Sequence, residues 1–307
     1  MGLPPFSGIV WLNGKYLPIE EANVNVMTHS LHYGFGVFEG VRAYETASGP
    51  AIFRLQAHTD RLFRSAHMLQ MKLPYTKEEL NEVQQELLRK NKLNSAYIRP
   101  LCFAGPESLG LRLTKDTTIN VMVAAWTWGA YMGKASLESG IHLCVSSFSR
   151  HFANSTLNKA KACGNYINSI LATQEAVANG YDEVLMLDTQ GFVAEASSSN
   201  FFMVINGELI TPPTDACLQG ITRDTVIQMA RDFGIRVIER RITRDEVYVA
   251  DEAFLTGTAV EMTPICSVDK RTLGEGKPGP ITLKLQEAFF AAVSGKGSAY
   301  PEWLTLV

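Results

Sequence analysis

The stretch from Ser155 to Ser169 places two lysines among small residues, just before a Gly-Asn-Tyr sequence and an apolar-periodic run. Small neighbours allow a bulky group to approach a lysine side chain closely. An amine held away from water loses its proton more easily, and a neutral amine is a nucleophile that forms Schiff bases with carbonyl compounds. Most lysines are instead solvated surface residues. The stretch by itself leaves this alternative open, and it offers both Lys159 and Lys161 as candidates.

The composition favours a globular enzyme over a nucleic-acid-binding or membrane protein. The 307 residues are 46% hydrophobic and 19% charged, and their number allows about two domains. The net charge of -3 gives no reason to expect nucleic acid or an anionic membrane as partner. No apolar run approaches the roughly 20 residues that span a bilayer, and the N-terminal residues lack the features of a signal peptide. We expect neither nucleic acid nor a membrane as partner.

The cysteines and histidines indicate a reducing compartment and no metal site. The five cysteines are scattered, with no pair at metal-ligand spacing. An odd, dispersed set is typical of reduced thiols in a cytosol, so we expect a cytoplasmic protein. The six histidines form no H-x-x-x-H pair, and we expect no metal.

Turn signals and periodicity predict two α+β domains rather than a doubly wound sheet. Asn13-Gly14 predicts a hairpin turn, and Thr76 and Thr243, each followed three residues later by glutamate, predict capping boxes. Helical periodicity is found over residues 55–71, 164–179, 222–233 and 281–293. The pattern breaks at a glycine-rich run. We therefore expect a small domain over residues 1–128, a linker over 129–135 and a larger domain over 136–307.

Three further features match the needs of pyridoxal phosphate, which requires a lysine, a partner for its pyridine nitrogen and donors for its phosphate. Glu195 lies amid small and apolar residues and is a candidate for the nitrogen, although alone it is better explained as a hairpin surface residue. Gly220 precedes a helix whose first N–H groups suit an anion, and plain capping by Thr222 explains this run about equally well. Arg61 is either a bidentate phosphate ligand or an ordinary surface arginine.

The order of these features resembles the branched-chain amino-acid aminotransferases, within the group that includes D-amino-acid transaminases and aminodeoxychorismate lyases. The matching runs span nearly the whole chain: His32-Tyr33-Gly34, Val37-Phe38-Glu39-Gly40, His58 to Leu62, Ala96 to Pro100, Trp128 to Tyr131, Lys161 to Tyr166, Glu195 to Asn200, Gly220 to Arg223, and Gly257-Thr258-Ala259. The family's K-x-x-G-N-Y spacing selects Lys161 over Lys159.

The resemblance implies a role for each matched residue. Lys161 is the catalytic lysine that forms the Schiff base, Glu195 pairs with the pyridine nitrogen, and Tyr166 hydrogen-bonds the phenolic oxygen of the ring. The phosphate is held by Arg61, Ile221, Thr222 and Thr258, and Ser198 and Gly257 complete the cofactor-binding set. The implied substrate-binding residues are Tyr33, Phe38, Tyr97, Tyr131, Thr258, Ala259 and Arg99, the last of which receives the distal carboxylate of glutamate.

The resemblance also implies a fold and a reaction. The expected fold is that of a fold type IV pyridoxal-phosphate aminotransferase, with a small N-terminal α/β domain and a larger C-terminal domain with a β-barrel-like core. The expected reaction is transamination of leucine, isoleucine and valine with 2-oxoglutarate. The alternatives are a D-amino-acid or amine transaminase, or an aminodeoxychorismate lyase, and the Tyr97-Ile98-Arg99-Pro100 run argues against them. A non-catalytic cofactor carrier is disfavoured because Glu195 and Arg99 are both present.

The resemblance further implies assembly. In relatives, the small domain of one subunit closes the pocket of the other. We therefore expect a homodimer at least, with a hexamer as a further option.

Overall fold

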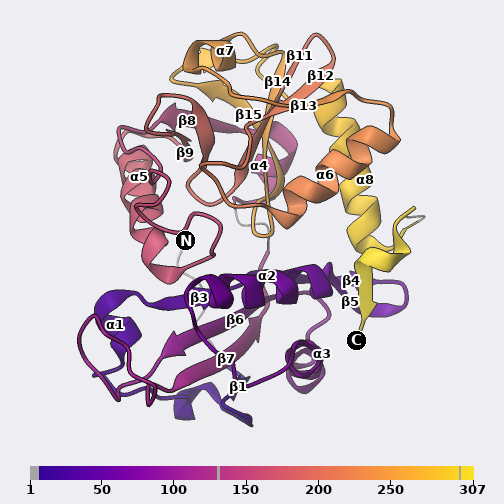
Figure 1. Cartoon of the computed structure of the whole chain (residues 1–307). Coiled ribbons are helices and arrows are strands. Elements are labelled where there is room, and N and C mark those ends of the chain that lie inside the picture. Colours follow the sequence, from indigo (N-terminus) through magenta and orange to yellow (C-terminus); the bar gives the residue numbers. More distant parts are fainter. Residues whose placement is uncertain (1–6, 130–131, 297–298) are drawn as a thin grey trace. The chain divides into compact units, whose positions relative to one another are not determined.

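The computed structural model describes residues 7–129, 132–296 and 299–307, and it divides into two compact units that we treat separately (Figure 1). Unit 1 comprises Met1–Trp128, Ala160–Gly164 and Ala292–Val307, and unit 2 comprises Gly129–Lys159 and Asn165–Ala291. The two short segments of unit 1 lie within the residues expected to form the second domain. They belong to unit 1 because of long-range strand pairing, which sequence periodicity does not reveal.

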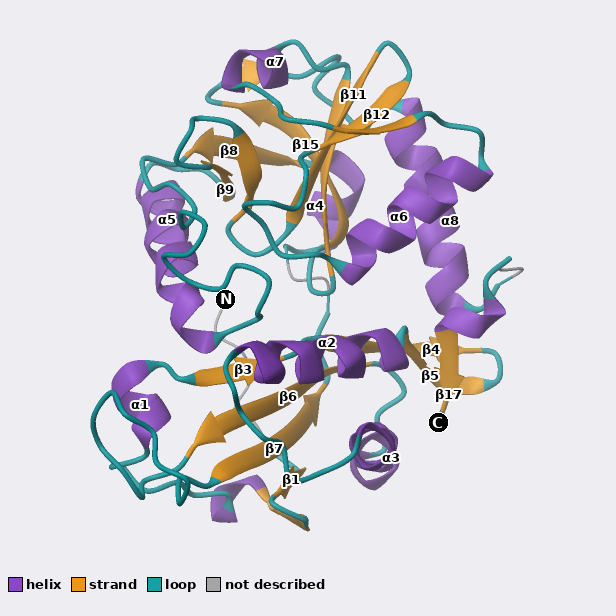
Figure 2. Ribbon diagram, in the orientation of Figure 1, coloured by secondary structure: helices purple, strands orange, loops and turns teal. Residues whose placement is uncertain are grey.

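Unit 1 is built on one antiparallel sheet in the order β17-β5-β4-β6-β7-β1-β2, with β3 paired to β6 (Figure 2). The strands are β1 (Ile9–Leu12), β2 (Lys15–Pro18), β3 (Gly36–Phe38), β4 (Val41–Thr46), β5 (Gly49–Phe53), β6 (Ala96–Ala104), β7 (Ile119–Trp126) and β17 (Leu304–Leu306). The helices of unit 1 are α1 (His29–Tyr33), α2 (Leu55–Met68) and α3 (Lys77–Asn91). Helices α2 and α3 contact each other, and their apolar faces form one core with the sheet.

Local signals in unit 1 act as the sequence predicts. Asn13 and Gly14 have φ values of 49° and 89°, as a primed hairpin turn requires, and β1 pairs with β2. At the start of α3, Thr76 and Glu79 form both hydrogen bonds of a capping box. Helix α2 begins at the predicted residue but ends at Met68, three residues before the predicted end.

Unit 2 contains a curled mixed sheet in the order β10-β9-β8-β15-β14-β11-β12-β13, with β16 paired to β15 (Figure 2). Its strands are β8 (Ile141–Val145), β9 (Glu183–Leu187), β10 (Val193–Ala196), β11 (Asn200–Ile205), β12 (Glu208–Thr211), β13 (Val237–Glu239), β14 (Glu252–Gly257), β15 (Glu261–Val268) and β16 (Arg271–Thr272). Its helices are α4 (Lys134–Ser139), α5 (Tyr166–Ala178), α6 (Ile221–Asp232), α7 (Arg244–Tyr248) and α8 (Pro280–Ser294). Strand β8 is parallel to both of its neighbours, β9 and β15, and β12 is parallel to β13. The other pairs are antiparallel.

The predicted α+β class is confirmed, since both units combine helices with mostly antiparallel strands. Helix α4 begins inside the expected linker, a helix that the glycine-rich sequence did not predict. None of the helices in the described part of the chain combines the length and hydrophobicity that a membrane span requires. Likewise, the described residues contain no cluster of three or more potential metal ligands.

Candidate active site

The predicted site residues fall into two groups, one in each unit. Tyr131 lies outside the described residues. Unit 1 holds Tyr33, Phe38, Arg61, Tyr97, Arg99 and Lys161. Unit 2 holds Tyr166, Glu195, Ser198, Ile221, Thr222, Gly257, Thr258 and Ala259.

The segment around Lys161 is fixed to unit 1 through its backbone. The Phe38 N–H donates to the Lys161 carbonyl at 3.0 Å, and the Lys161 N–H donates to Ser65 Oγ at 3.0 Å. An isolated bridge joins Val37 to Ala162, and the Gly164 N–H donates to the Gly34 carbonyl. The lysine backbone therefore has one position, and only the side chain is left to move.

The Lys161 side chain lies over the same aromatic ring as an arginine. Lys161 Nζ is 4.9 Å from the centre of the Phe38 ring, and the Arg99 guanidinium carbon is 4.7 Å from the same centre. Arg99 also lies over the rings of Tyr97 and Trp126, and it has no acidic partner among the described residues. The rings stabilise the cation without neutralising it, so this part of unit 1 attracts anions.

Gly40 allows Tyr97 to approach the backbone. A Cβ atom at Gly40 would lie 1.9 Å from the Tyr97 hydroxyl oxygen, so any larger residue would displace the ring. Tyr33, in contrast, is on α1 with 47% of its surface exposed. Within unit 1 the structure therefore brings together Phe38, Tyr97, Arg99 and Lys161, and it leaves Tyr33 open to solvent.

Arg61 is a buried residue and not an ordinary surface arginine. It is 5% exposed, and its Nε and Nη2 atoms bind the two oxygens of Glu39 at 2.6 and 2.9 Å. His58 Nδ1 lies 2.8 Å from Glu39 Oε2. Because Glu39 occupies the Nε edge of the guanidinium, a phosphate cannot be bound bidentately at that edge. The assignment of Arg61 as a phosphate ligand stays a prediction, restricted to the opposite edge.

The pKa shifts define the charges in this cluster. Burial alone would raise the pKa of Glu39, but the Arg61 guanidinium and the His58 hydrogen bond outweigh burial and hold that pKa well below its ordinary value. Burial lowers the pKa of His58 below its ordinary value. Glu39 is therefore anionic and His58 neutral at neutral pH, and His58 Nδ1–H donates to the carboxylate.

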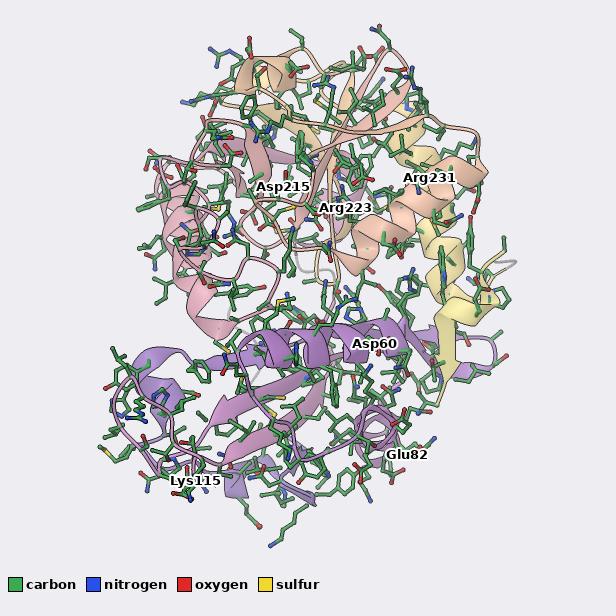
Figure 3. All side chains as sticks on the ribbon, viewed as in Figure 1. Asp60, Glu82, Lys115, Asp215, Arg223 and Arg231 are labelled. Carbon is green, nitrogen blue, oxygen red and sulfur yellow. The ribbon has the colours of Figure 1, made fainter. Side chains whose placement is uncertain are left out.

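Glu39→Gln should destabilise the folded protein by about 3–5 kcal/mol, because it leaves the buried Arg61 charge without its partner. Glu82→Gln is a matched control, since Glu82 pairs with Arg89 at 3.1 Å on the exposed surface of α3 (Figure 3). An exposed pair contributes up to about 1 kcal/mol. Urea unfolding measures both changes, and equal effects of the two substitutions would contradict the assigned burial of Glu39.

In unit 2, Glu195 is buried and not a hairpin surface residue. It lies on β10 and is 3% exposed. The pairing of β10 with β9 is shifted between Val193 and Glu195, an irregularity of the kind that re-aims a side chain. Arg150 Nη2 is 2.7 Å from Glu195 Oε1. The Asn200 side chain and the Leu218 N–H each donate to Oε2 at 3.4 Å.

The first turn of α6 has backbone N–H groups that no side chain caps, and such groups can bind an anion. Gly220 is the N-cap residue and supplies no side-chain hydrogen bond, and Thr222 at the second helical position is buried. Plain capping by Thr222 is therefore not what the structure shows. A Cβ at Gly220 would lie 1.9 Å from Asn200 Oδ1, which explains the glycine. The neighbouring Arg223, labelled in Figure 3, is directed elsewhere, because it donates to the Pro212 carbonyl and to Glu239.

Two buried hydroxyls near this helix start lack a hydrogen-bond partner within the described residues, namely Ser199 Oγ and Thr256 Oγ1. Thr256 on β14 pairs with Asn200 on β11, and Ser199 directly precedes Asn200. Gly257 follows Thr256 and lies close to Ser199. Ser198 is exposed, while Thr258 and Ala259 are half-buried. Uncapped N–H groups and unpaired hydroxyls in one unit, with a buried carboxylate beside them, suit a group that carries a phosphate and a basic ring nitrogen.

Unit 2 also holds Tyr166, a predicted cofactor residue, and Lys159, the lysine that the family spacing did not select. Tyr166 is half-buried at the first position of α5, and Lys159 Nζ is 3.5 Å from the Cys217 carbonyl oxygen. The two lysines thus differ in surroundings, since Lys159 is attached to the Cys217 loop while Lys161 lies against Phe38 in unit 1.

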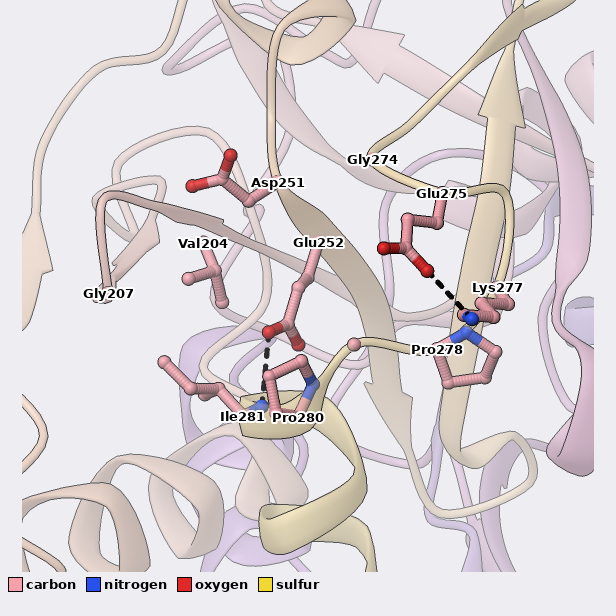
Figure 4. A pocket seen from close by; sticks show the side chains of 11 residues that line it. Val204, Gly207, Asp251, Glu252, Gly274, Glu275, Lys277, Pro278, Pro280 and Ile281 are labelled. Carbon is pink, nitrogen blue, oxygen red and sulfur yellow. Dashed lines mark hydrogen bonds and ion pairs between the residues drawn. The ribbon is translucent and has the colours of Figure 1, made fainter.

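A separate cavity of about 440 Å³ lies in unit 2, between β14 and the start of α8 (Figure 4). None of the predicted site residues lines it. Its buried Glu252 accepts from the N–H groups of Ile281 and Thr282 and therefore caps α8. Helix capping accounts for the buried carboxylate of Glu252, and we assign the cavity no role in catalysis.

Sequence reasoning missed three residues of the site, namely Glu39, His58 and Arg150. Glu39 and His58 stand inside the matched runs, so their positions were visible but their contacts were not. Arg150 precedes the lysine stretch in a segment without periodicity, and its contact with Glu195 depends on how β9 and β10 fold. No spacing rule connects positions 150 and 195.

Comparison with known proteins gives consistent matches. Residues 36–268 match the family Amino-transferase class IV. The branched-chain-amino-acid aminotransferase of Pseudomonas aeruginosa is 53% identical over 307 residues, which cover 100% of both chains.

Solved structures give the same result. The T.th. branched-chain amino acid aminotransferase complexed with 4-methylvaleric acid has a TM-score of 0.92 and 47% identity, with 98% of each chain covered. Its complex with N-(5'-phosphopyridoxyl)-L-glutamate has a TM-score of 0.93 and 47% identity, again with 98% of each chain covered. The ligands of these structures combine a branched carbon chain, a pyridoxyl phosphate and glutamate.

Proposed function

The chain belongs to the class IV aminotransferases, and from this premise we propose that it transfers the amino group of L-leucine, L-isoleucine and L-valine to 2-oxoglutarate with pyridoxal 5'-phosphate as cofactor. The products are the branched 2-oxo acids and L-glutamate. The relatives named above support the substrates. The observation in this chain that carries the proposal is the location of Lys161 and Arg99 against the same Phe38 ring.

Pyridoxal phosphate, when bound, supplies an aldehyde that joins the substrate amine and a ring that withdraws electrons from the substrate α-carbon. Lys161 Nζ would hold the aldehyde end in the absence of substrate and, as a free amine, would move the proton between the substrate α-carbon and the cofactor side, acting as base and then as acid. Its clamped backbone limits this motion to the side chain. Glu195 keeps negative charge at the ring nitrogen, which keeps that nitrogen protonated.

The phosphate is assigned to the first turn of α6, with Ile221, Thr222 and the hydroxyl of Thr258. Helix N-termini suit anions because their N–H groups are unsatisfied and the helix dipole is positive there. Ser198 and Gly257 are assigned to the same cofactor, and Tyr166 to the phenolic oxygen of its ring. Arg61 adds a cation that Glu39 holds in a fixed orientation.

The substrate pocket must accept both an apolar side chain and a carboxylate. Phe38, Tyr97, Tyr33, Tyr131 and Ala259 are assigned to the apolar part. Apolar contact contributes about 25 cal/mol for each Å² removed from water. Arg99 is half-buried, so water can solvate its charge when leucine is bound, and the carboxylate of glutamate can replace that water.

A direct assay tests this function. The purified protein should form L-glutamate from 2-oxoglutarate with L-leucine, L-isoleucine and L-valine, and it should do so far more slowly with D-alanine or a simple amine. D-Alanine turnover equal to that of L-leucine would instead support the D-amino-acid transaminase, and cleavage of aminodeoxychorismate would support the lyase.

Arg99→Ala should weaken the use of glutamate and 2-oxoglutarate at least about tenfold more than the use of leucine, measured as kcat/KM. The reason is that a hydrogen bond to a charged group contributes roughly 1.5–3 kcal/mol, and only the dicarboxylates make it. Half-reaction kinetics with each amino acid separately provides the comparison. Equal losses for leucine and glutamate would mean that Arg99 holds the α-carboxylate or supports the fold.

We further propose that the protein is cytoplasmic and assembles as a homodimer at least, with a hexamer as a further option. Helix α5 supports assembly, because Ile167, Ile170, Leu171 and Val177 expose apolar side chains on it. Sedimentation at assay concentration should give a dimer or larger, and Ile170→Lys should shift it toward a monomer. A wild-type protein that is fully active as a monomer would refute this proposal.

A further inference from the structure

Arg150 makes the shortest of the described contacts to the Glu195 carboxylate. Its Nη2 atom lies 2.7 Å from Glu195 Oε1, whereas the donors to Oε2 are both at 3.4 Å. The long contacts are geometrically weak. Of the contacts described for Glu195, this ion pair is the shortest and involves an oppositely charged group, so it contributes most to holding the carboxylate.

Arg150 is itself fixed on the side away from the carboxylate. Its Nη1 atom donates to Asn168 Oδ1 at 3.0 Å and to Ser169 Oγ at 3.2 Å, both on α5. Its backbone N–H donates to the Leu187 carbonyl at the end of β9. The guanidinium is thus held by α5 and the Arg150 backbone by β9, and the planar fork presents one nitrogen to Glu195.

The surroundings make this cation necessary for the charge of Glu195. A buried carboxylate without a partner costs several kcal/mol and tends to take up a proton instead. The neighbouring Cys217 is not a second anion that competes with Glu195 for Arg150. Burial, reinforced by the Glu195 charge, raises the pKa of its thiol to about 12. The cations that act on Cys217 are Arg223, Lys159 and Arg150. Arg223 is directed to Glu239 and Lys159 to the Cys217 carbonyl, whereas Arg150 is directed to Glu195.

We propose that Arg150 is a positioning residue for the reaction: it keeps the Glu195 carboxylate ionised and aimed, so that the carboxylate can hold the proton on the pyridine nitrogen of the cofactor. The inference rests on the proposed function, since it assumes that Glu195 faces this ring nitrogen. It adds a residue that acts through Glu195 without touching the cofactor.

The test compares the binding of two cofactors that differ at one atom. Pyridoxal phosphate and its 1-deaza analogue, which has carbon in place of the ring nitrogen, are titrated into the apo form of each variant. The wild-type protein should bind pyridoxal phosphate more tightly than the analogue, and Glu195→Gln should abolish this preference. Arg150→Met should reduce the preference about tenfold or more, because the buried carboxylate loses its ion-pair partner.

A double-mutant cycle separates positioning from general stability. In the Glu195→Gln background, Arg150→Met should change the preference by no more than about twofold, because the carboxylate that it positions is absent. A purely structural role would weaken both cofactors equally and leave the preference unchanged. Arg244→Met is the matched control, since it removes an arginine that pairs with Asp269 elsewhere in unit 2 and should leave the preference as in wild type.

Two further outcomes decide the proposal. If Arg150→Met does not fold, Arg150→Lys takes its place, because a lysine keeps the charge but cannot bind Glu195 and α5 together, and its preference should fall below that of wild type. Retention of the full preference by a folded Arg150 variant, while Glu195→Gln loses it, would overturn the proposal. If the wild-type protein binds neither cofactor, the proposed function fails, which is a different result.

Discussion

Lys161→Ala should lower the turnover of L-leucine with 2-oxoglutarate by about 10⁴-fold or more, without unfolding the protein. Two losses combine, because the same amine holds the cofactor aldehyde and moves the proton at the α-carbon. The fold should survive, because the contacts that fix this segment are backbone N–H and carbonyl groups that alanine retains. Single-turnover kinetics and thermal melting measure the two effects.

Lys159→Ala is the matched control for this result. Lys159 is two residues away in the same stretch, but its Nζ contacts the Cys217 carbonyl and not the Phe38 ring. We expect this variant to retain most of the activity. A small added amine such as methylamine should partly restore the Lys161→Ala variant, since the missing group is an amine. Loss of activity in Lys159→Ala with retention in Lys161→Ala would exchange the two assignments.

Glu195→Gln should keep the cofactor but reduce turnover about 100-fold or more. A neutral amide does not favour the protonated ring, so less electron density is withdrawn from the substrate α-carbon. The substitution also leaves Arg150 without its anion, and we expect a loss of stability of about 3–5 kcal/mol. Activity is therefore to be measured at a temperature where melting shows that the variant is folded.

The expected pattern for Glu195→Gln is a fall in kcat, while the dissociation constant of pyridoxal phosphate rises only to about that of the 1-deaza analogue. The phosphate contacts assigned to α6 do not involve this carboxylate. Near-normal turnover would show that Glu195 does not face the ring nitrogen, and a complete loss of cofactor would show that it mainly supports the binding site.

Local elements of the fold were predictable because their causes are local. The Asn13-Gly14 turn and the Thr76 and Thr243 capping boxes are each decided by residues within four positions, and all three are present. The choice of Lys161 over Lys159, which stays a prediction, also used only local sequence, because it depends on the family's spacing from the lysine to Gly164 and Tyr166. These features needed no knowledge of tertiary structure.

Non-local features could not be predicted in the same way. The pairing of Leu304–Leu306 with β5 joins residues that lie 251 to 255 positions apart, and no periodicity indicates it. The Glu39–Arg61 and Arg150–Glu195 pairs likewise depend on which strands become neighbours. Sequence identified Arg61 and Glu195 as candidates. Taken alone, it left a surface position open for Arg61 and favoured one for Glu195, and only the structure shows that both residues are buried.

The central claim is that Lys161 carries the cofactor and that a branched L-amino acid removes it from the lysine. Borohydride reduction followed by peptide mapping tests both parts in one measurement. In the absence of substrate, the pyridoxyl label should be found on Lys161. Prior incubation with L-leucine, without 2-oxoglutarate, should prevent labelling, whereas D-alanine should not. Label on Lys159, no label at all, or equal protection by D-alanine and L-leucine would contradict the account.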